Sequence, residues 1–521
     1  MRFVIALFIL LCCLPQVPLA LDGPTVIDTL ISDTVASWFG MRIVPVGDQN
    51  DDGYDDFLTF ELPRKLYLCL GGPAETGIQC MRIDDSSYSL INHLGFINDD
   101  SVSDFGAIRI TSTGRERLAV WYGGLPLSEG PDLLFGDDTQ WPGSTFPILG
   151  HDINGNGSPE LVAGYYHNIL YPSLLFFEID QALDSVVDFQ LWAPEREGYP
   201  GFGDAIITGD YNGDGWDDLV TNLRYGGGDT INDQVLLYWG GPVFDTIPDA
   251  RIVRCMTFNY DYKGFGYRLV YLNDINGDGW EDFLINYSES GSEDSCSWVH
   301  FGGPDFDTVP DVWICDNALE ARLAGDINND GYSDLIKGLS SSFSAIGQAN
   351  IYFGGPDFDS IPDIIIHHSM FSGYYNYFAH EVAGLGDVNG DGIDDFAIAS
   401  SQGSGFPWVI FIFAGWDDAV SVDDPLDPEP ALPTNFTLDQ NYPNPFNPIT
   451  TISFSLPRAE TVTLRILNAL GQTVAVLINE QRLGPGEHAV VWEAEGYASG
   501  VYLYELEYSS GQQSRKMVLI K

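Results

Sequence analysis

The acidic segment from Gly209 to Leu219, GDYNGDGWDDL, contains the residue types and spacing that suggest chemistry most directly. It holds four carboxylates within nine residues and has no Lys or Arg to balance their charge. Because like charges this close repel one another, a folded loop of this sequence requires a cation from outside the chain. Oxygen ligands without His or Cys are the set that selects Ca²⁺ over zinc or copper.

The same arrangement, Asp-x-Asn-x-Asp-Gly-x-x-Asp with small variations, recurs along the chain. Its six copies start at Gly47, His151, Gly209, Asn273, Gly325 and Gly386. A seventh segment, GFINDDSVSDF from Gly95, has Phe96 at the first Asp position, and we expect it to bind no ion because an aromatic ring replaces a charged oxygen ligand. Successive segments start 48 to 64 residues apart, which is the size of one four-stranded unit.

Positions 1, 3, 5 and 9 of each loop are the expected metal ligands. Alternate side chains of a tight loop point toward one centre, Gly at position 6 supplies a positive φ, and a backbone carbonyl at position 7 can complete the shell. The predicted ligands are Asp48, Asn50, Asp52, Asp56, Asp152, Asn154, Asn156, Glu160, Asp210, Asn212, Asp214, Asp218, Asp274, Asn276, Asp278, Asp282, Asp326, Asn328, Asp330, Asp334, Asp387, Asn389, Asp391 and Asp395. We therefore predict about six structural Ca²⁺ ions.

Other calcium-binding loops fit the pattern less well. An EF-hand needs Glu at position 12 between two helices, whereas that position is Thr59 in the first copy and Thr221 in the copy from Gly209. The flanking sequences MRIVPV and DFLTF read as strands. Paired loops of the dockerin type stand much closer together with helices between them, so the spacing disfavours them too.

A second repeat alternates with the first. The segments YWGGPVFDTIPD from Tyr238, HFGGPDFDTVPD from His300 and YFGGPDFDSIPD from Tyr352 follow apolar runs and predict sharp strand ends. Seven units of about 55 residues with four strands each predict an all-β fold, a seven-bladed β-propeller over residues 25–420. A sandwich of many strands is the alternative.

The combined motifs resemble the FG-GAP repeats of the integrin alpha-chain head and their bacterial relatives. WFGMRI, GFGDAII and GFGYRLV supply Phe-Gly at the start of a first strand, and the Gly-Gly-Pro and acidic segments complete the pattern. The resemblance implies calcium loops between strands 1 and 2 of a blade, on the face opposite the one that usually binds ligand. Integrin heads carry fewer such loops than this chain, so the bacterial proteins are the better match.

The C-terminal part differs in composition from the propeller region. Residues 421–435 are acidic and Pro-rich, which is typical of a semi-rigid linker. Residues 436–521 hold eight acidic and six basic side chains, and their alternating strands predict a small immunoglobulin-like β-sandwich.

Four landmarks in this part resemble the sorting domain of type IX secretion substrates: NYPNPFNP from Asn441, NALGQ from Asn468, SGVYLYEL from Ser499 and KMVLIK from Lys516. Leu467 stands where the family often has Tyr. The resemblance implies contact with the type IX machinery and export through a Bacteroidetes-type outer membrane. An ordinary immunoglobulin-like appendage is the alternative.

The N-terminus and the composition indicate an exported protein. Residues 1–20 read as a signal peptide, with an N-terminal membrane anchor as the alternative, and no later segment is long and apolar enough for a transmembrane helix. The expected location is secreted or on the outer cell surface, via the periplasm. Two local disulfides, Cys69–Cys80 and Cys296–Cys315, would leave Cys255 free, although five cysteines allow other pairings. The formal charge of -53 excludes nucleic acid as a partner.

No catalytic motif emerges, and most acidic pairs lie in the loops, where a bound ion would keep them ionised. Aromatic clusters instead precede two first strands, on the expected ligand-binding face, although each tyrosine can equally pack between blades. The candidate ligand-binding residues are Tyr260, Tyr262, Tyr374, Tyr375 and Tyr377. The sequence thus predicts a non-catalytic, adhesion-type module for an extracellular protein or glycan. A polysaccharide-degrading propeller hydrolase or lyase, or a lectin, is the alternative.

Overall fold

The computed structural model describes most of residues 24–520, and the described part is all-β, with no helix among its elements. The residues outside the description are 1–23, 32–38, 62–64, 74–75, 84–86, 99, 111–115, 128–129, 136–144, 168–170, 179–186, 195–199, 226–232, 243, 254–263, 288–294, 319, 340–346, 368–375, 402–407, 418–435, 439, 442–443, 445, 447, 457–459, 469–471, 484–485, 495, 509–510 and 521. The predicted signal peptide and the predicted linker both lie outside it. The described residues include no helix that is apolar over a membrane-spanning length. The chain divides into two compact units, Met1–Ala419 and Val420–Lys521.

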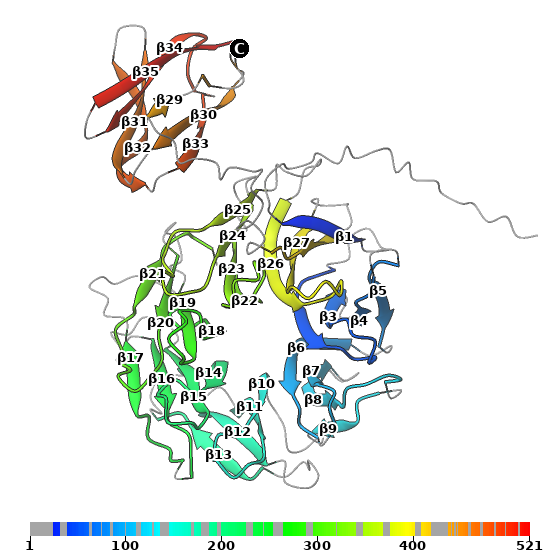
Figure 1. Cartoon of the computed structure of the whole chain (residues 1–521). Coiled ribbons are helices and arrows are strands. Elements are labelled where there is room, and N and C mark those ends of the chain that lie inside the picture. The colour runs from blue at the N-terminus through cyan, green and yellow to red at the C-terminus, as the bar shows by residue number, and fades with distance from the viewer. Residues whose placement is uncertain are drawn as a thin grey trace, which may run out of the picture. The chain divides into compact units, whose positions relative to one another are not determined.

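Seven four-stranded antiparallel sheets make up the first unit (Figure 1). Grouped by sheet, the strands are β2 (Ile43–Gly47), β3 (Asp56–Glu61), β4 (Lys65–Leu70) and β5 (Gln79–Arg82); β6 (Ser87–Gly95), β7 (Asp104–Ile110), β8 (Glu116–Trp121) and β9 (Leu133–Phe135); β10 (Thr145–His151), β11 (Glu160–His167), β12 (Tyr171–Glu178) and β13 (Phe189–Trp192); β14 (Pro200–Gly209), β15 (Asp218–Tyr225), β16 (Gln234–Tyr238) and β17 (Ala250–Val253); β18 (Arg268–Asn273), β19 (Asp282–Tyr287), β20 (Cys296–His300) and β21 (Val312–Ile314); β22 (Glu320–Gly325), β23 (Asp334–Leu339), β24 (Gln348–Tyr352) and β25 (Ile364–His367); and β26 (Asn376–Gly386), β27 (Asp395–Ser401) and β28 (Trp408–Ala414) with β1 (Thr25–Ile31). Six of the sheets keep their strands in chain order, as propeller blades do.

The seventh sheet joins the two ends of this unit. Its strand order is β1-β28-β27-β26, with Thr25 opposite Ala414 and Ile31 opposite Val409. The first strands of neighbouring sheets contact one another around the axis, and β26 contacts β2, so the ring is closed (Figure 1). The predicted seven-bladed β-propeller is therefore confirmed, and its blades are numbered here from 1, the sheet of β2, to 7, the sheet of β26.

The hydrophobic core of the propeller lies between neighbouring blades. One cluster joins Val46 and Leu58 of blade 1 to Phe105 and Trp121 of blade 2, and similar clusters link other blades. Strands inside a blade are covered on both faces, as in β19, where every residue is buried. Burial of each large apolar side chain stabilises the fold by about 1.5–3 kcal/mol, so contacts between blades hold the ring together.

The first glycine of each Gly-Gly pair lies where two backbones pass closely. A Cβ atom on Gly240 would stand 2.1 Å from the backbone oxygen of Asp217, and the corresponding distance at Gly302 is also 2.1 Å, to the oxygen of Glu281. Real Cβ atoms do not approach an oxygen so closely. The repeat therefore requires glycine at this position for the close approach of the two backbones.

Gly240→Ala is expected to lower the free energy of unfolding by about 1–3 kcal/mol, because the new methyl group must displace a backbone oxygen. Urea denaturation followed by tryptophan fluorescence measures this loss. Gly130→Ala is the matched control, since a Cβ there would meet no atom within 4 Å. Equal stability of the two variants would show that the blade tolerates a side chain at Gly240.

The second unit is a small β-sandwich, as expected. Its sheets have the strand orders β29-β30-β33 and β32-β31-β34-β35. The strands are β29 (Thr437–Leu438), β30 (Ile449–Leu456), β31 (Glu460–Asn468), β32 (Thr473–Leu483), β33 (Gly486–Glu493), β34 (Gly500–Tyr508) and β35 (Gly511–Leu519). Buried residues from both sheets, among them Ile452, Trp492, Leu464 and Tyr504, form one core.

The first of the sorting-domain landmarks connects to two others in this sandwich. The backbone N–H of Asn441 donates to the Tyr504 hydroxyl at 2.8 Å, and Phe446 N–H donates to the Val518 carbonyl at 3.0 Å. Ile520 N–H donates to the Phe446 carbonyl at 2.9 Å. The segment NYPNPFNP is thus attached both to β34 and to the C-terminal strand.

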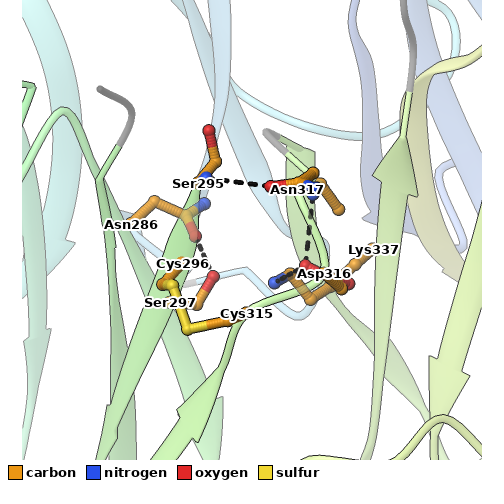
Figure 2. The surroundings of a disulfide bond; sticks show 9 residues. Asn286, Ser295, Cys296, Ser297, Cys315, Asp316, Asn317 and Lys337 are labelled. Atoms are coloured by element: carbon orange, nitrogen blue, oxygen red, sulfur yellow. Dashed lines mark hydrogen bonds and ion pairs between the residues drawn. A yellow bond between two sulfur atoms is a disulfide. The ribbon is translucent and has the colours of Figure 1, made fainter. Parts of the chain in front are cut away.

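Both expected disulfides are present, and Cys255 lies outside the described residues. The Cys296–Cys315 bond anchors the segment that follows β21, and next to it Asp316 Oδ1 lies 2.7 Å from Lys337 Nζ of blade 6 (Figure 2). Burial lowers the pKa of the fully buried Lys337, and the Asp316 carboxylate opposes this shift. The disulfide therefore positions the carboxylate that neutralises a buried charge across the boundary of blades 5 and 6.

Candidate metal-binding loops

The seven acidic segments all form loops between the first and second strands of a blade. In blade 4, for example, the loop runs between β14, which ends at Gly209, and β15, which begins at Asp218. Because the blades repeat one strand order around the ring and loops of neighbouring blades are hydrogen-bonded to each other, the seven loops lie at the same end of the propeller. The fold therefore places the predicted ligand residues on one face.

The oxygens of positions 1 and 3 share one backbone donor, the N–H of position 5, within each complete loop. In blade 4 the N–H of Asp214 lies 3.1 Å from Asp210 Oδ1 and 2.8 Å from Asn212 Oδ1, so these two oxygens are close neighbours. Asp210 Oδ2 accepts from Gly215 N–H at 2.9 Å. The bonds of position 1 recur in the other complete loops, at Asp48, Asp152, Asp274, Asp326 and Asp387.

The position-3 amide also connects positions 5 and 9. Asn212 Nδ2 lies 3.1 Å from Asp214 Oδ2 and 3.3 Å from Asp218 Oδ1. The four predicted ligands of blade 4 therefore converge on one small region. In the other complete loops the position-3 amide lies near position 5, in blades 1, 5 and 6, or near position 9, in blades 3 and 7.

Position 9 is a buried carboxylate in all seven blades. Asp218 Oδ2 accepts from Tyr211 N–H at 3.0 Å, and Oδ1 accepts from Gly240 N–H, in the Gly-Gly-Pro turn, at 2.8 Å. Burial raises the pKa of Asp218 to about 8 against these hydrogen bonds, and the neighbouring carboxylates raise it further. Burial likewise raises the pKa to about 7 for Asp56, Glu160, Asp282 and Asp395 and to about 8 for Asp334.

None of these six carboxylates has an ion pair with Lys, Arg or His in the described part of the chain. Among the described residues, carboxylate, imidazole and thiolate groups do not by themselves form a metal centre of three or more. A metal shell in these loops thus depends on the Asn oxygen and a backbone carbonyl as well. This mixed set of hard oxygen donors fits Ca²⁺ in kind.

The loop from Gly95 has the same framework without the first carboxylate. Asn98 Oδ1 accepts from Asp100 N–H at 3.0 Å, and Asp104 accepts from Ile97 and from Gly123, as position 9 does elsewhere. The Phe96 side chain is 61% exposed. The hydrogen bonds of positions 3 and 9 therefore form even where the ligand set is incomplete.

Acidic residues at position 8 of blades 1, 5 and 7 each accept a backbone hydrogen bond from the loop of the neighbouring blade, a link that the sequence did not predict. Glu281 Oε2 of blade 5 accepts from Asp210 N–H of blade 4 at 2.7 Å. Asp55 of blade 1 likewise accepts from Asp387 N–H of blade 7 at 2.9 Å. Two adjacent acidic residues at positions 8 and 9 are visible in the sequence of these blades. The sequence does not reveal that position 9 accepts hydrogen bonds from its own blade, whereas position 8 accepts one from the neighbouring blade.

The second glycine and position 7 make further links between blades. Gly303 N–H of blade 5 donates to the Tyr211 carbonyl of blade 4 at 2.9 Å. The Trp280 ring, at position 7 in blade 5, covers Gly213 in the loop of blade 4, where a Cβ would stand 2.8 Å from the ring. The two sequence repeats thus form one network that runs around the loop face.

The candidate aromatic ligands are mostly beyond the structural description. Tyr260, Tyr262, Tyr374 and Tyr375 lie outside the described residues. Tyr377, in β26, is 44% exposed and has a φ of 57°. It lies at the end of its strand away from the metal-binding loops, and its part in ligand binding stays a prediction.

In metal-free protein, stability is expected to fall as the pH rises. The pKa values of about 7 for Asp282 and about 8 for Asp334 lie above the ordinary 3.8, so the folded state binds protons more tightly than the unfolded state. The resulting stabilisation is complete at low pH and is lost between about pH 4 and pH 8. In EDTA, the melting temperature followed by circular dichroism should be several degrees lower at pH 8 than at pH 5.5. A metal-free melting temperature that rises over this interval would contradict the raised pKa values of these buried carboxylates.

Comparisons with known proteins agree with these two units. Residues 440–521 match the family described as secretion system C-terminal sorting domain. Integrin alpha-PS3 of Drosophila melanogaster is 25% identical over 241 residues, which is 40% of this chain and 19% of that protein. Integrin alpha-5 of Xenopus laevis is 26% identical over 176 residues, 30% of this chain and 16% of that protein. Integrin alpha-4 of Xenopus laevis is 28% identical over 103 residues, 19% of this chain and 10% of that protein. The chain thus spans less than a fifth of these relatives' length.

A solved structure, titled "Crystal structure of BBS1N in complex with ARL6DN, soaked with mercury", aligns with 77% of this chain and 98% of its own, at 10% identity and a TM-score of 0.41. A score this low supports no functional argument. Residues 440–521 are therefore a secretion-system C-terminal sorting domain, and the preceding seven-bladed β-propeller is similar in sequence to integrin alpha chains.

Proposed function

We propose that this chain is an exported, calcium-stabilised β-propeller that binds an extracellular protein or glycan without catalysing a reaction. In each of the six complete loops, the predicted ligands at positions 1, 3, 5 and 9 together hold one Ca²⁺ ion. The ions are structural, because each loop lies within the network that joins neighbouring blades.

The observation that carries the calcium proposal is the buried carboxylate at position 9. Asp218 is fully buried beside Asp214 and Asp210, and its pKa is raised to about 8, yet no basic side chain in the described part of the molecule is paired with it. A divalent cation bound to these oxygens supplies the missing positive charge. The same reasoning applies to the five other complete loops.

The binding proposal rests on the two faces of the ring and on the tail. The loop face is occupied by hydrogen bonds between blades, which leaves the opposite face, with Tyr377, free to vary for recognition. The sorting domain supports export by the type IX pathway, to the cell surface or the medium, with the secretion machinery as a partner. Similarity to integrin alpha chains supports an adhesion-type role.

An array of glycans and extracellular-matrix proteins, probed with the full mature chain in 1 mM Ca²⁺ and in EDTA, tests this function. The expected result is calcium-dependent binding to a restricted set of ligands, without turnover. Release of reducing ends or unsaturated uronates from plant or marine polysaccharides would instead establish the hydrolase or lyase alternative. Binding that is confined to glycans would identify a lectin.

A further inference from the structure

Charged side chains gather on the first strands of several blades or directly before them, at the end away from the metal-binding loops. Arg42, Arg268, Glu320 and Glu381 each lie six residues before the first position of their loop, in blades 1, 5, 6 and 7. Arg322 lies two residues beyond Glu320 on β22. Because first strands meet around the axis, these five residues come together, and we refer to them as the axial cluster.

Ion pairs connect most of the axial cluster. Arg268 Nη2 pairs with Glu320 Oε1 across blades 5 and 6. Arg322 Nη2 lies 3.0 Å from Glu381 Oε1 in blade 7, and Arg322 Nη1 lies 3.6 Å from Glu320 Oε2. The carboxylates of Glu320 and Glu381 therefore pair with the guanidinium groups of Arg268 and Arg322, and Arg42 takes no part in these ion pairs.

Arg42 is the member of the cluster without a carboxylate partner. Its Nη2 donates to Asn92 Oδ1 at 3.2 Å, while its Nε is buried without a hydrogen-bond partner. Burial lowers the pKa of Arg42 to about 10, with Arg322 as the next contributor, and Glu381 opposes the shift. Arg42 therefore remains charged at neutral pH, and the cluster of three arginines and two glutamates has an excess of one positive charge. The neighbouring ion pair of blade 4, in which Arg224 Nη2 lies 3.2 Å from Asp204 Oδ2, leaves this excess unchanged.

This positive excess stands out in a chain of net charge -53, and Arg42 is half-buried among partly exposed neighbours. The side chains of Arg268, Glu320 and Arg322 are 22%, 13% and 19% exposed. Beside them the Tyr267 ring is 49% exposed, and the Arg268 guanidinium carbon lies 5.6 Å from its centroid. The cluster thus combines an unpaired guanidinium with an accessible aromatic ring.

We propose that the axial cluster binds the carboxylate of an acidic sugar, with Arg42 as its main partner and Tyr267 packed against the sugar ring. This inference deepens the proposed function, on which it rests, by naming the ligand class of the face opposite the loops. A guanidinium pairs with a carboxylate through charge-assisted hydrogen bonds, and an aromatic ring covers the apolar face of a sugar. The net charge repels densely acidic polymers, so the geometry suits a single uronate on an otherwise neutral glycan.

Isothermal titration of the full mature chain in 1 mM Ca²⁺ tests this proposal with three probes. They are xylotetraose carrying one glucuronate branch, unbranched xylotetraose, and a blocked tetrapeptide with one Glu. The branched sugar is expected to bind, and Arg42→Gln is expected to weaken it by about tenfold or more, because a charge-assisted bond is lost. Arg251→Gln, which removes an exposed arginine on β17, is the matched control and should bind as the wild type does.

Thermal stability separates binding from a structural role of Arg42. Since Arg42 is an unpaired, desolvated charge, Arg42→Gln should melt at or above the wild-type temperature; a clear decrease would mark it as structural and overturn the proposal. Tyr267→Leu offers a second variant, expected to weaken the branched sugar while leaving the fold intact.

Three binding outcomes would also overturn the inference. Equal binding by Arg42→Gln and Arg251→Gln would remove Arg42 from the site. Arg42-dependent binding of the peptide without the sugar would make the occupant a protein. Equal affinity for branched and unbranched sugars would refute recognition of the carboxylate while leaving glycan binding by the propeller intact. If the chain binds no ligand in the array of glycans and matrix proteins, that result refutes the proposed function itself.

Discussion

Removal of Ca²⁺ by EDTA is expected to lower the melting temperature of the propeller by about 10 °C. Extracellular calcium modules have dissociation constants near 10⁻⁴ M, so at 1 mM free Ca²⁺ each occupied loop adds about 1.4 kcal/mol to the free energy of unfolding. Six independent loops together add about 8 kcal/mol, which is comparable with the whole stability of a typical domain. The expected loss is large because the ions bind the folded ring and not the unfolded chain.

Differential scanning calorimetry in Ca²⁺, in EDTA and after Ca²⁺ is restored measures this effect, and native mass spectrometry counts the ions. Recovery of the melting temperature on restoring Ca²⁺ controls for nonspecific effects of the chelator. The sorting domain, which lacks such loops, is expected to keep its transition in all three conditions. An unchanged propeller transition, or a metal-free mass in Ca²⁺, would refute the calcium assignment.

Asp218→Ala is expected to remove one ion and to destabilise the propeller by several kcal/mol. The change removes the acceptor of the Gly240 N–H, at about 1–3 kcal/mol, and also removes a metal ligand. The Tyr211 N–H loses its bond to Asp218 and keeps the Gly209 carbonyl, at 3.1 Å, as an acceptor. Urea denaturation in Ca²⁺ gives the total loss, and native mass spectrometry reports the number of ions that remain.

Asp104→Ala is the matched control for this experiment. Asp104 accepts the same two kinds of backbone hydrogen bond, from Ile97 and Gly123, but belongs to the loop with Phe96 at position 1. It should lose the hydrogen bonds and no ion, so in Ca²⁺ Asp218→Ala should be the less stable variant by about 1.4 kcal/mol. In EDTA the difference should vanish or reverse, because Asp218 then contributes an unpaired buried carboxylate. Equal ion counts for the two variants would remove position 9 from the ligand set.

The sequence was sufficient to predict the blades because the fold repeats locally. Each acidic loop and each Gly-Gly-Pro turn has a backbone requirement that is visible in residue type, as at Gly240, and the number of copies gives the number of blades. The convergence of positions 1, 3, 5 and 9 follows equally from local spacing, because a nine-residue loop constrains its own side chains.

Contacts between blades could not be predicted from local sequence spacing. The pairing of Glu281 with the backbone of Asp210 joins residues of successive repeats, and nothing in either repeat alone indicates it. The axial cluster is harder still to predict, since Arg42 of blade 1 and Glu381 of blade 7 come near each other only because the ring is closed. The partner of β1 was missed for the same reason: its residues are mostly exposed, and they pair with a strand at the far end of the propeller.

The pairing of β1 with β28 has a consequence for how the molecule is assembled. Thr25 and Ala414 are opposite each other although roughly 390 residues separate them, so an emerging chain must keep its first strand unattached until blade 7 exists. Once the other strands of blade 7 have formed, β28 presents an open edge until β1 pairs with it, and β1 from a second molecule has the same sequence as the missing strand. A crowded exit site therefore favours strand exchange between copies, which would yield intertwined dimers from a protein whose finished ring has no open seam.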